Sequence, residues 1–161
     1  MSDSQPTAPA GLLRRLAALC YDTLLLFGVA FAYGVVVWAL RTLAGQDTLE
    51  PLRGPAAVLE LAGLALVLAG YYVLCWVRRG QTLGMKAWRL RVERVDGHLL
   101  DARTAWRRAL LALVSALPVG LGYWWAWFDA EGRTWHDRWT ATRVVKLPSP
   151  SAALGERPTP S

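Results

Sequence analysis

Long apolar stretches separated by short charged segments make up most of the chain, and two of them are long enough to cross a membrane. The first, residues 16–40, contains Asp22 as its only charge, and the second, residues 56–77, contains only Glu60. A transmembrane helix needs about 20 apolar residues at a rise of about 1.5 Å each. We therefore predict two membrane-spanning helices. The first is too long for a cleavable signal peptide, so we expect it to remain as an anchor.

A third stretch, residues 109–128, is uncharged but is interrupted by Pro118, Gly120 and Gly122. It is either a re-entrant hairpin that turns at residues 118–122 or a third span kinked at the proline. The basic residues that follow favour the hairpin, because it returns them to the side where basic residues collect. Such irregular backbone at membrane depth must be covered by protein or line a cavity.

Basic residues are distributed unevenly around the predicted spans, and the net charge is +6. Only Arg41 and Arg53 lie between the two spans, whereas residues 78–108 carry nine Arg or Lys residues. Because basic residues in short loops stay in the cytoplasm, we predict a cytoplasmic N-terminus and a cytoplasmic 78–108 segment. We expect that segment to contact the anionic headgroups of the lipid bilayer rather than nucleic acid.

The polar segments predict a small cytoplasmic β element. Apolar residues alternate with arginine over residues 88–95, which is typical of a strand. Residues 96–97 read Asp-Gly, which suits a tight hairpin turn, so we predict a return strand at 98–100. The alternative is an amphipathic helix in the membrane interface. Residues 141–145 also alternate and predict a strand that pairs with this hairpin.

Other features set the limits of the domain. Asp101 is the predicted N-cap of a helix that leads into the third apolar stretch. Residues 1–10 and 147–161 are expected to be disordered, which leaves 11–146 as one membrane domain.

Aromatic residues around the end of the third stretch suit an interfacial belt; they are Tyr123, Trp124, Trp125, Trp127, Trp135 and Trp139.

Asp22 is the strongest candidate for chemistry, because a carboxylate within a span costs about 2.5–3.5 kcal/mol and needs a partner or a cavity. Arg15 lies two helical turns earlier on the same face, and Tyr71 and Tyr72 on the second span have nearly the same depth. Asp22 is either a proton or cation site or part of a buried ionic network that fixes helix packing. Glu60, near the outer end of its span, is expected to be a solvated supporting group.

Enzymatic chemistry has little support. His136 adjoins Asp137, but no serine motif or glycine-rich elbow accompanies the pair. Cys20 and Cys75 lie in apolar stretches, and no Cys/His cluster has the spacing of a zinc site. Residues 80–86 lack the glycine spacing of a P-loop. We therefore expect no enzyme activity, no cofactor and no metal.

Several ordered motifs together resemble the RDD family of small bacterial integral membrane proteins. They are Arg15, Asp22, the sequence GQTLGMKAWRLRV at 80–92 and the sequence WHDRWTATRVV at 135–145. The family is named for one arginine and two aspartates, and the resemblance implies that these are Arg15, Asp22 and Asp137. It also implies a role in the bacterial inner membrane, where some members are linked to exchange of monovalent cations for protons and others to membrane assemblies.

From these observations we predict an all-α, multi-pass inner-membrane protein with two transmembrane helices, a broken third segment and a small cytoplasmic β element. We expect a transport or cation/proton exchange component in which Asp22 titrates, Arg15 tunes it and Asp137 completes a cluster near the cytoplasmic face. The alternative is a non-transporting assembly or partner-binding module whose charged residues are structural. Two or three spans are too few to form a complete alternating-access pathway, and transport therefore implies a homo-oligomer or a membrane partner subunit.

Overall fold

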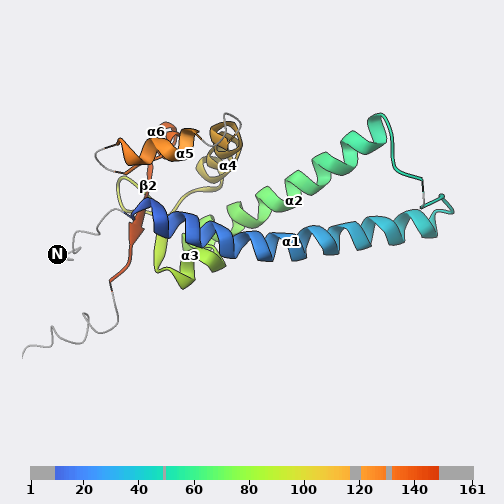
Figure 1. Ribbon diagram of the computed structural model, residues 1–161, viewed down its shortest axis with the longest axis horizontal. Helices are drawn as coiled ribbons and strands as arrows, with labels where there is room; N and C mark the ends of the chain where they lie inside the picture. Colours follow the sequence, from blue (N-terminus) through green and yellow to red (C-terminus); the bar gives the residue numbers. More distant parts are fainter. Residues whose placement is uncertain (1–9, 49, 117–120, 130–131, 149–161) are drawn as a thin grey trace, which may run out of the picture.

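Two long helices form the body of the computed structural model, which describes residues 10–48, 50–116, 121–129 and 132–148. Helix α1 (Leu12–Leu43) and helix α2 (Pro55–Arg79) have opposite chain directions, and both extend to the same side from a group of smaller elements (Figure 1). Both are long and apolar enough to cross a membrane. They contain the two predicted spans and extend beyond them, because the helical backbone continues into the flanking polar residues.

Local sequence sets the limits of α2. Pro55 is the first helical residue, where its missing N–H costs no hydrogen bond. Arg78 and Arg79 occupy the last turn, where cations interact favourably with the helix dipole. Gly80 ends the helix with a φ of 67°, a left-handed conformation that glycine adopts without strain. A side chain at Gly80 would also approach the carbonyl oxygen of Val92 to 2.7 Å.

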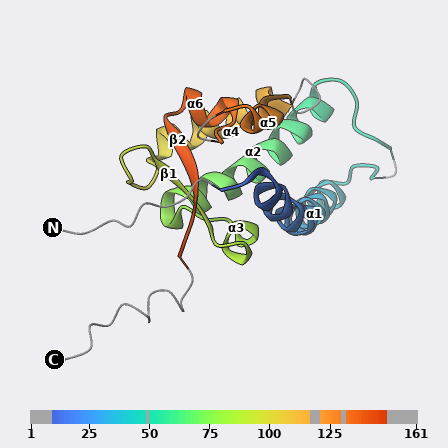
Figure 2. The ribbon, with the colours of Figure 1, turned by 60° about the vertical axis from the view of Figure 1, so that its left-hand side comes forward.

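The remaining elements pack together at one end of the long helices, and we call them the head (Figure 2). In chain order they are α3 (Leu83–Ala87), β1 (Leu90–Arg94), α4 (Ala102–Ala116), α5 (Leu121–Trp124), a 3-10 turn η1 (Trp125–Trp127), α6 (Trp135–Trp139) and β2 (Thr142–Lys146). The start of α1 belongs to this end too, because the N–H of Ala10 donates to the carbonyl of Val144 at 3.1 Å. Residue 10, expected to be disordered, is therefore ordered and buried; residues 1–9 and 149–161 lie outside the described part of the chain.

The sheet pairs β1 with β2 in antiparallel register, with Val92 opposite Val144. Across the strands Glu93 and Arg143 form an ion pair of 2.7 Å. The return strand predicted at 98–100 was wrong. After β1 the chain makes a tight turn, in which the N–H of Arg94 donates to the carbonyl of His98 at 2.9 Å, and then leaves the sheet for α4. The partner of β1 is β2, which corresponds to the strand predicted at residues 141–145.

The predicted third apolar stretch is not one continuous helix. Helix α4 begins where the sequence predicted, with Asp101 as its cap accepting from the N–H of Thr104 at 3.2 Å, and ends at Ala116. Pro118 and Gly120 lie outside the described residues. Beyond them the chain lies back against α4, since a side chain on Gly122 would come within 2.6 Å of the Cβ of Ser115. Within the described residues, therefore, α4 and α5 pack as two short helices.

The head contains an internal repeat in which residues 132–146 follow residues 80–94 at a distance of 52 positions. Each copy begins with a glycine at positive φ and a threonine two residues later, which caps a five-residue helix. Each helix is followed by a non-glycine residue at positive φ and then by a five-residue strand; these two residues are Arg89 and Ala141. Because equivalent residues Val92 and Val144 face each other, the two copies are related by a local twofold axis.

The repeat extends to the helices that precede each copy. Helix α3 packs against α1, and α6 packs against α4. The order of elements α1, α2, α3, β1 is thus followed by α4, α5, α6, β2, with the long helices of the first half replaced by short ones in the second. In this sense α4 and α5 are the counterparts of the two long helices.

Candidate functional site

A buried ion-pair cluster lies where α1, α4 and α6 meet. Asp137 on α6 is fully buried, and its Oδ2 lies 2.6 Å from Nη1 of Arg15 on α1. Its Oδ1 lies 2.5 Å from Nη1 of Arg108 on α4. Arg15 is anchored further, because its Nε donates to the carbonyl of Ala10 at 3.1 Å. Arg108 also donates to the hydroxyl of Thr142 on β2. One carboxylate therefore connects three helices to the sheet.

The local backbone holds the Asp137 carboxylate in place. Thr134 is the N-cap of α6, and Asp137 is the third helical residue, so the two form a capping box. The N–H of Thr134 donates to Oδ2 of Asp137 at 3.1 Å. Burial by itself would raise the pKa of Asp137, but the guanidinium groups of Arg108 and Arg15 hold this pKa well below its usual range. Asp137 is therefore ionised throughout the physiological pH range.

His136 is buried beside this cluster and is neutral near pH 7. Its Nε2 lies 2.9 Å from the hydroxyl of Thr134, and its ring packs against Tyr123 at 5.0 Å between centroids. Burial, together with the nearby charge of Arg108, lowers the pKa of His136 from 6.5 to about 3.

Asp22 occupies a separate place, at the N-terminus of α3. Its Oδ2 accepts from the hydroxyl of Thr82 at 2.5 Å and its Oδ1 from the N–H of Gly84 at 2.8 Å. The hydroxyl of Tyr71 adds a longer contact of 3.4 Å to Oδ1. Thr82 in turn caps α3 by accepting from the N–H of Met85. The Asp22 side chain thus fastens α3 to α1, and each five-residue helix of the repeat has a buried aspartate at its start.

The structure brings together only part of the predicted set. Arg15 contacts Asp137, as a shared cluster requires, but its guanidinium binds Asp137 and Ala10 rather than approaching Asp22. Tyr71 reaches Asp22, as its depth suggested. Tyr72 packs edge-on against Tyr71 and faces a cavity. Glu60 lies near the start of α2, where its backbone carbonyl accepts from the hydroxyl of Tyr33 on α1.

Two functional partners were missed from the sequence, although each left a signal. Arg108 lies three residues after buried Ala105 and next to buried Ala109, so it is a charged residue on the apolar face of α4. Thr82 is the last residue of a Gly-x-Thr motif that occurs at residues 80–82 and again at 132–134. That spacing marks both threonines as helix caps.

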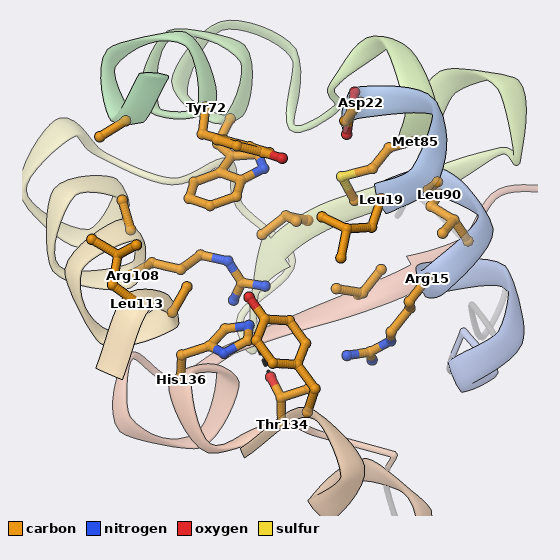
Figure 3. A pocket seen from close by; sticks show the side chains of 18 of the residues that line it. Arg15, Leu19, Asp22, Tyr72, Met85, Leu90, Arg108, Leu113, Thr134 and His136 are labelled. Carbon is orange, nitrogen blue, oxygen red and sulfur yellow. Dashed lines mark hydrogen bonds between the residues drawn. The ribbon is translucent and has the colours of Figure 1, made fainter. Parts of the chain in front are cut away.

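A cavity of about 410 Å³ lies between the long helices and the head. Figure 3 shows the side chains of Arg108, His136, Thr134 and Arg15 grouped toward one side of it, with Asp22 and Tyr72 on the opposite side. The apolar wall comes from both long helices and includes Leu26, Ala65 and Leu68. The volume falls within the range of about 300–1,000 Å³ that is usual for ligand sites.

Four buried polar atoms on residues that line this cavity have no hydrogen-bond partner in the described part of the chain. They are Nη2 of Arg15, Nε of Arg108, Nε1 of Trp76 and Nδ1 of His136. The guanidinium of Arg108 also lies over the Trp76 ring, 5.2 Å from its centroid. Unpaired buried groups are rare because each costs about 1–3 kcal/mol. Within the described ranges, no three His, Cys, Asp or Glu residues are grouped as metal ligands would be.

Comparison with known proteins places most of the chain in a family. Residues 9–141 match the RDD family, so the match includes the long helices, the first copy of the head repeat, the second copy up to residue 141, and the buried residues Arg15, Asp22, Arg108 and Asp137. No curated protein and no solved structure matches the chain.

Proposed function

The chain belongs to the RDD family, and from this membership and the geometry of its charged groups we propose that it is a non-transporting membrane module that binds a partner. One observation carries the proposal. Both family aspartates are held by fixed donors from the same chain, Asp137 by two arginines and Asp22 by a hydroxyl and a backbone N–H. A carboxylate that closes helix contacts in this way is suited to holding the fold together, not to releasing and taking up ions.

The proposed setting is the bacterial inner membrane, with the head and the N-terminus in the cytoplasm. The basic residues of the 78–108 segment belong to the head or adjoin it, and such residues stay cytoplasmic. The contact between Ala10 and Val144 supports placing both ends of the domain on one side. With the ends so joined, the α4–α5 pair is best understood as re-entering from the head side.

The proposed partners are a second copy of the chain or another membrane subunit, together with anionic headgroups at the 78–108 segment. Large side chains on α1 project outward and are available for lipid or protein contact; among them are Phe27, Phe31 and Trp38, which are 57–75% exposed. We propose no catalytic role. His136 is buried and hydrogen-bonded to Thr134, which suits a packing function.

The alternative is a cation/proton exchange component in which Asp22 titrates. It has one observation in its favour, because Asp22 and Arg15 line the same cavity and so have access to a shared space. The triad of Arg15, Asp22 and Asp137 would then act at the cytoplasmic end of the pathway, and a homo-oligomer or partner subunit would complete it.

Proton movement in proteoliposomes distinguishes the two functions. The purified chain and its Asp22→Asn variant are reconstituted and given a gradient of a monovalent cation, with thermal melts in detergent to check that both are folded. The binding-module proposal expects no cation-dependent proton movement in either protein. Movement in the folded wild type that is lost in the folded variant would overturn it and establish exchange.

A further inference from the structure

The cavity between the long helices and the head has features that the packing role of Asp137 and Asp22 does not explain. Its two arginines share a single carboxylate, and four buried polar atoms of its lining residues have no partner within the described ranges. Its other walls are apolar side chains of α1, α2 and α4. A space with one polar end and one apolar end selects an amphiphile.

Charge at the polar end is not balanced. Arg15 and Arg108 contribute two positive charges, Asp137 contributes one negative charge, and His136 is neutral. Asp22 lies on the opposite side of the cavity and is occupied by its own donors (Figure 3). A buried charge without a counter-ion is strongly unfavourable, so the polar end is complementary to an anion.

The unpaired atoms define what kind of anion fits. Arg15 Nη2, Arg108 Nε and Trp76 Nε1 are all N–H donors. Arg108 and Trp76 are 3% and 7% exposed, and the Arg15 side chain is 11% exposed. Guanidinium groups bind phosphate oxygens with charge-assisted hydrogen bonds, and an indole N–H adds a further donor. A phosphate headgroup accepts from several donors at once.

The apolar end leads away from these donors along the long helices. Leu26 lies eleven residues after Arg15 on α1, and Ala65 lies eleven residues before Trp76 on α2. Each interval corresponds to roughly 16 Å of helix. An alkyl chain running along this wall would bury apolar surface that otherwise lines an open space.

We propose that the cavity binds an anionic phospholipid, with the phosphate at Arg15, Arg108 and Trp76 and one alkyl chain between α1 and α2. This site lies inside the domain and differs from headgroup contacts on the surface of the 78–108 segment. The inference deepens the proposed binding function and rests on it, since it names a membrane lipid as a ligand of the module.

Native mass spectrometry of the full chain, released from detergent with defined lipids, tests the proposal. The probes are phosphatidylglycerol, phosphatidylcholine with identical chains, and inorganic phosphate alone. We expect retention of phosphatidylglycerol and about tenfold weaker retention of phosphatidylcholine, as the loss of charge complementarity predicts. Equal retention of the two lipids, or equally tight binding of inorganic phosphate, would overturn the proposal.

Variants locate the site. Ala69→Phe fills the cavity from α2, and Ala62→Phe places the same side chain on an exposed position of the same helix outside the cavity. Phosphatidylglycerol binding should fall in the first and stay unchanged in the second. If Ala69→Phe fails to fold in a thermal melt, Trp76→Phe serves, because it keeps an aromatic face for Arg108 and removes only the indole N–H. That variant should bind about tenfold more weakly.

The same preparations separate this inference from the function on which it rests. Proton movement, measured after the same purified protein is reconstituted into proteoliposomes, decides between the binding module and the exchanger. Lipid retention without proton movement supports both proposals. Absence of selective lipid retention without proton movement removes the lipid site and leaves the module.

Discussion

Asp137 closes a contact among three helices that has no substitute within the described residues. Its two oxygens each bind a different arginine, and neither arginine is more than 11% exposed at its side chain. Removing one member of a buried ion pair leaves its partner charged and unpaired, which costs far more than losing an exposed pair. Asp137 therefore both neutralises buried charge and holds α1, α4 and α6 together.

Asp137→Asn is expected to lower the free energy of unfolding by about 3–5 kcal/mol, since two buried guanidinium groups lose their counter-charge. Thermal unfolding of the detergent-solubilised protein measures the effect. Asp96→Asn is the matched control, because Asp96 forms an exposed ion pair with Arg94 and its replacement should cost less than about 1 kcal/mol. Equal melting of the two variants would show that the Asp137 cluster is not stabilising.

His136 predicts an acid-sensitive fold. Its pKa falls from 6.5 in the unfolded chain to about 3 in the folded one, so between these values only the unfolded state binds the proton. Stability must then decrease as the pH falls below about 6.5, by about 2 kcal/mol at pH 5. The lowered pKa of Asp137 has no effect in this window, because its contribution is lost only as the pH falls below its ordinary value of 3.8.

The His136→Gln variant checks this assignment. Glutamine keeps a polar partner for Thr134 but does not titrate, so its melting temperature should change less between pH 7 and pH 5 than that of the wild type. A wild-type melting temperature that does not vary over this range would contradict the buried, neutral histidine.

At the scale of elements, the two five-residue helices show how a short helix is held. Neither α3 nor α6 is long enough to be stable alone, since isolated helices shorter than about 12–15 residues are marginal in water. Each has a threonine cap and a buried aspartate at its start. The aspartate of α6 comes from its own sequence, whereas that of α3 comes from α1. The same local design therefore serves both copies, with a different source for the carboxylate.

Close backbone approach makes Gly84 sensitive to substitution. A Cβ at this position would overlap the carbonyl oxygen of Ala18 and lie 2.9 Å from Cγ of Asp22. Gly84→Ala should therefore push α3 away from α1 and cost about 1–3 kcal/mol. Gly28→Ala, in open space on α1, should stabilise the helix by about 0.5–1 kcal/mol. Thermal melts of both variants test this, and a neutral Gly84→Ala would show that α3 is not closely packed.

The sequence predicted the long elements well because their signal is additive. Twenty or more apolar residues identify each span whatever surrounds them, and the alternation around Val92 and Val144 identified both strands of the sheet. Partner choice was predicted in part. The strand expected at residues 141–145 pairs with the strand before Gly97, as predicted, whereas the local return strand suggested by the tight turn does not form. Local patterns identify a strand or a turn, but whether a further strand joins the pair depends on tertiary contacts.

The charged site was also predicted only in part. Family motifs singled out Arg15, Asp22 and Asp137, but spacing along one helix suggested that Arg15 and Asp22 would be coupled. The folded chain separates them, because Asp137 brings a closer opposite charge to Arg15 and α3 brings neutral donors to Asp22. Arg108 was missed because a single arginine among many basic residues carries no signal until the apolar face of α4 is recognised.

At the scale of the whole molecule, the contact of Ala10 with Val144 places the start and end of the domain together. The loop between α1 and α2 lies at the opposite end of the long helices (Figure 1). If both long helices span the membrane, this loop and the head must face opposite compartments.

Labelling of single cysteines with an impermeant reagent tests this arrangement. Cys20 and Cys75 are free in the structure and are first replaced by serine. A cysteine at Gln46 should react in intact spheroplasts, whereas cysteines at His98 and Lys146 should react only after permeabilisation. Reaction of Lys146→Cys in intact cells, with His98→Cys protected, would instead indicate that the α4–α5 segment crosses the membrane once.

The ion pair between Arg15 and Asp137 can form only late in the synthesis of the chain. Its two residues are 122 positions apart, so at about 5–20 residues per second the ribosome takes roughly 6–24 s to supply the partner of Arg15. During that interval both long helices can already be in the bilayer, while Arg15 at the start of α1 still lacks its carboxylate partner. A nascent chain that stops before residue 137 therefore lacks the ion pairs of Asp137 with Arg15 and Arg108, and it is exposed to proteolysis in that state. Completion of the last short helix and strand is the step that converts an inserted chain into a finished protein.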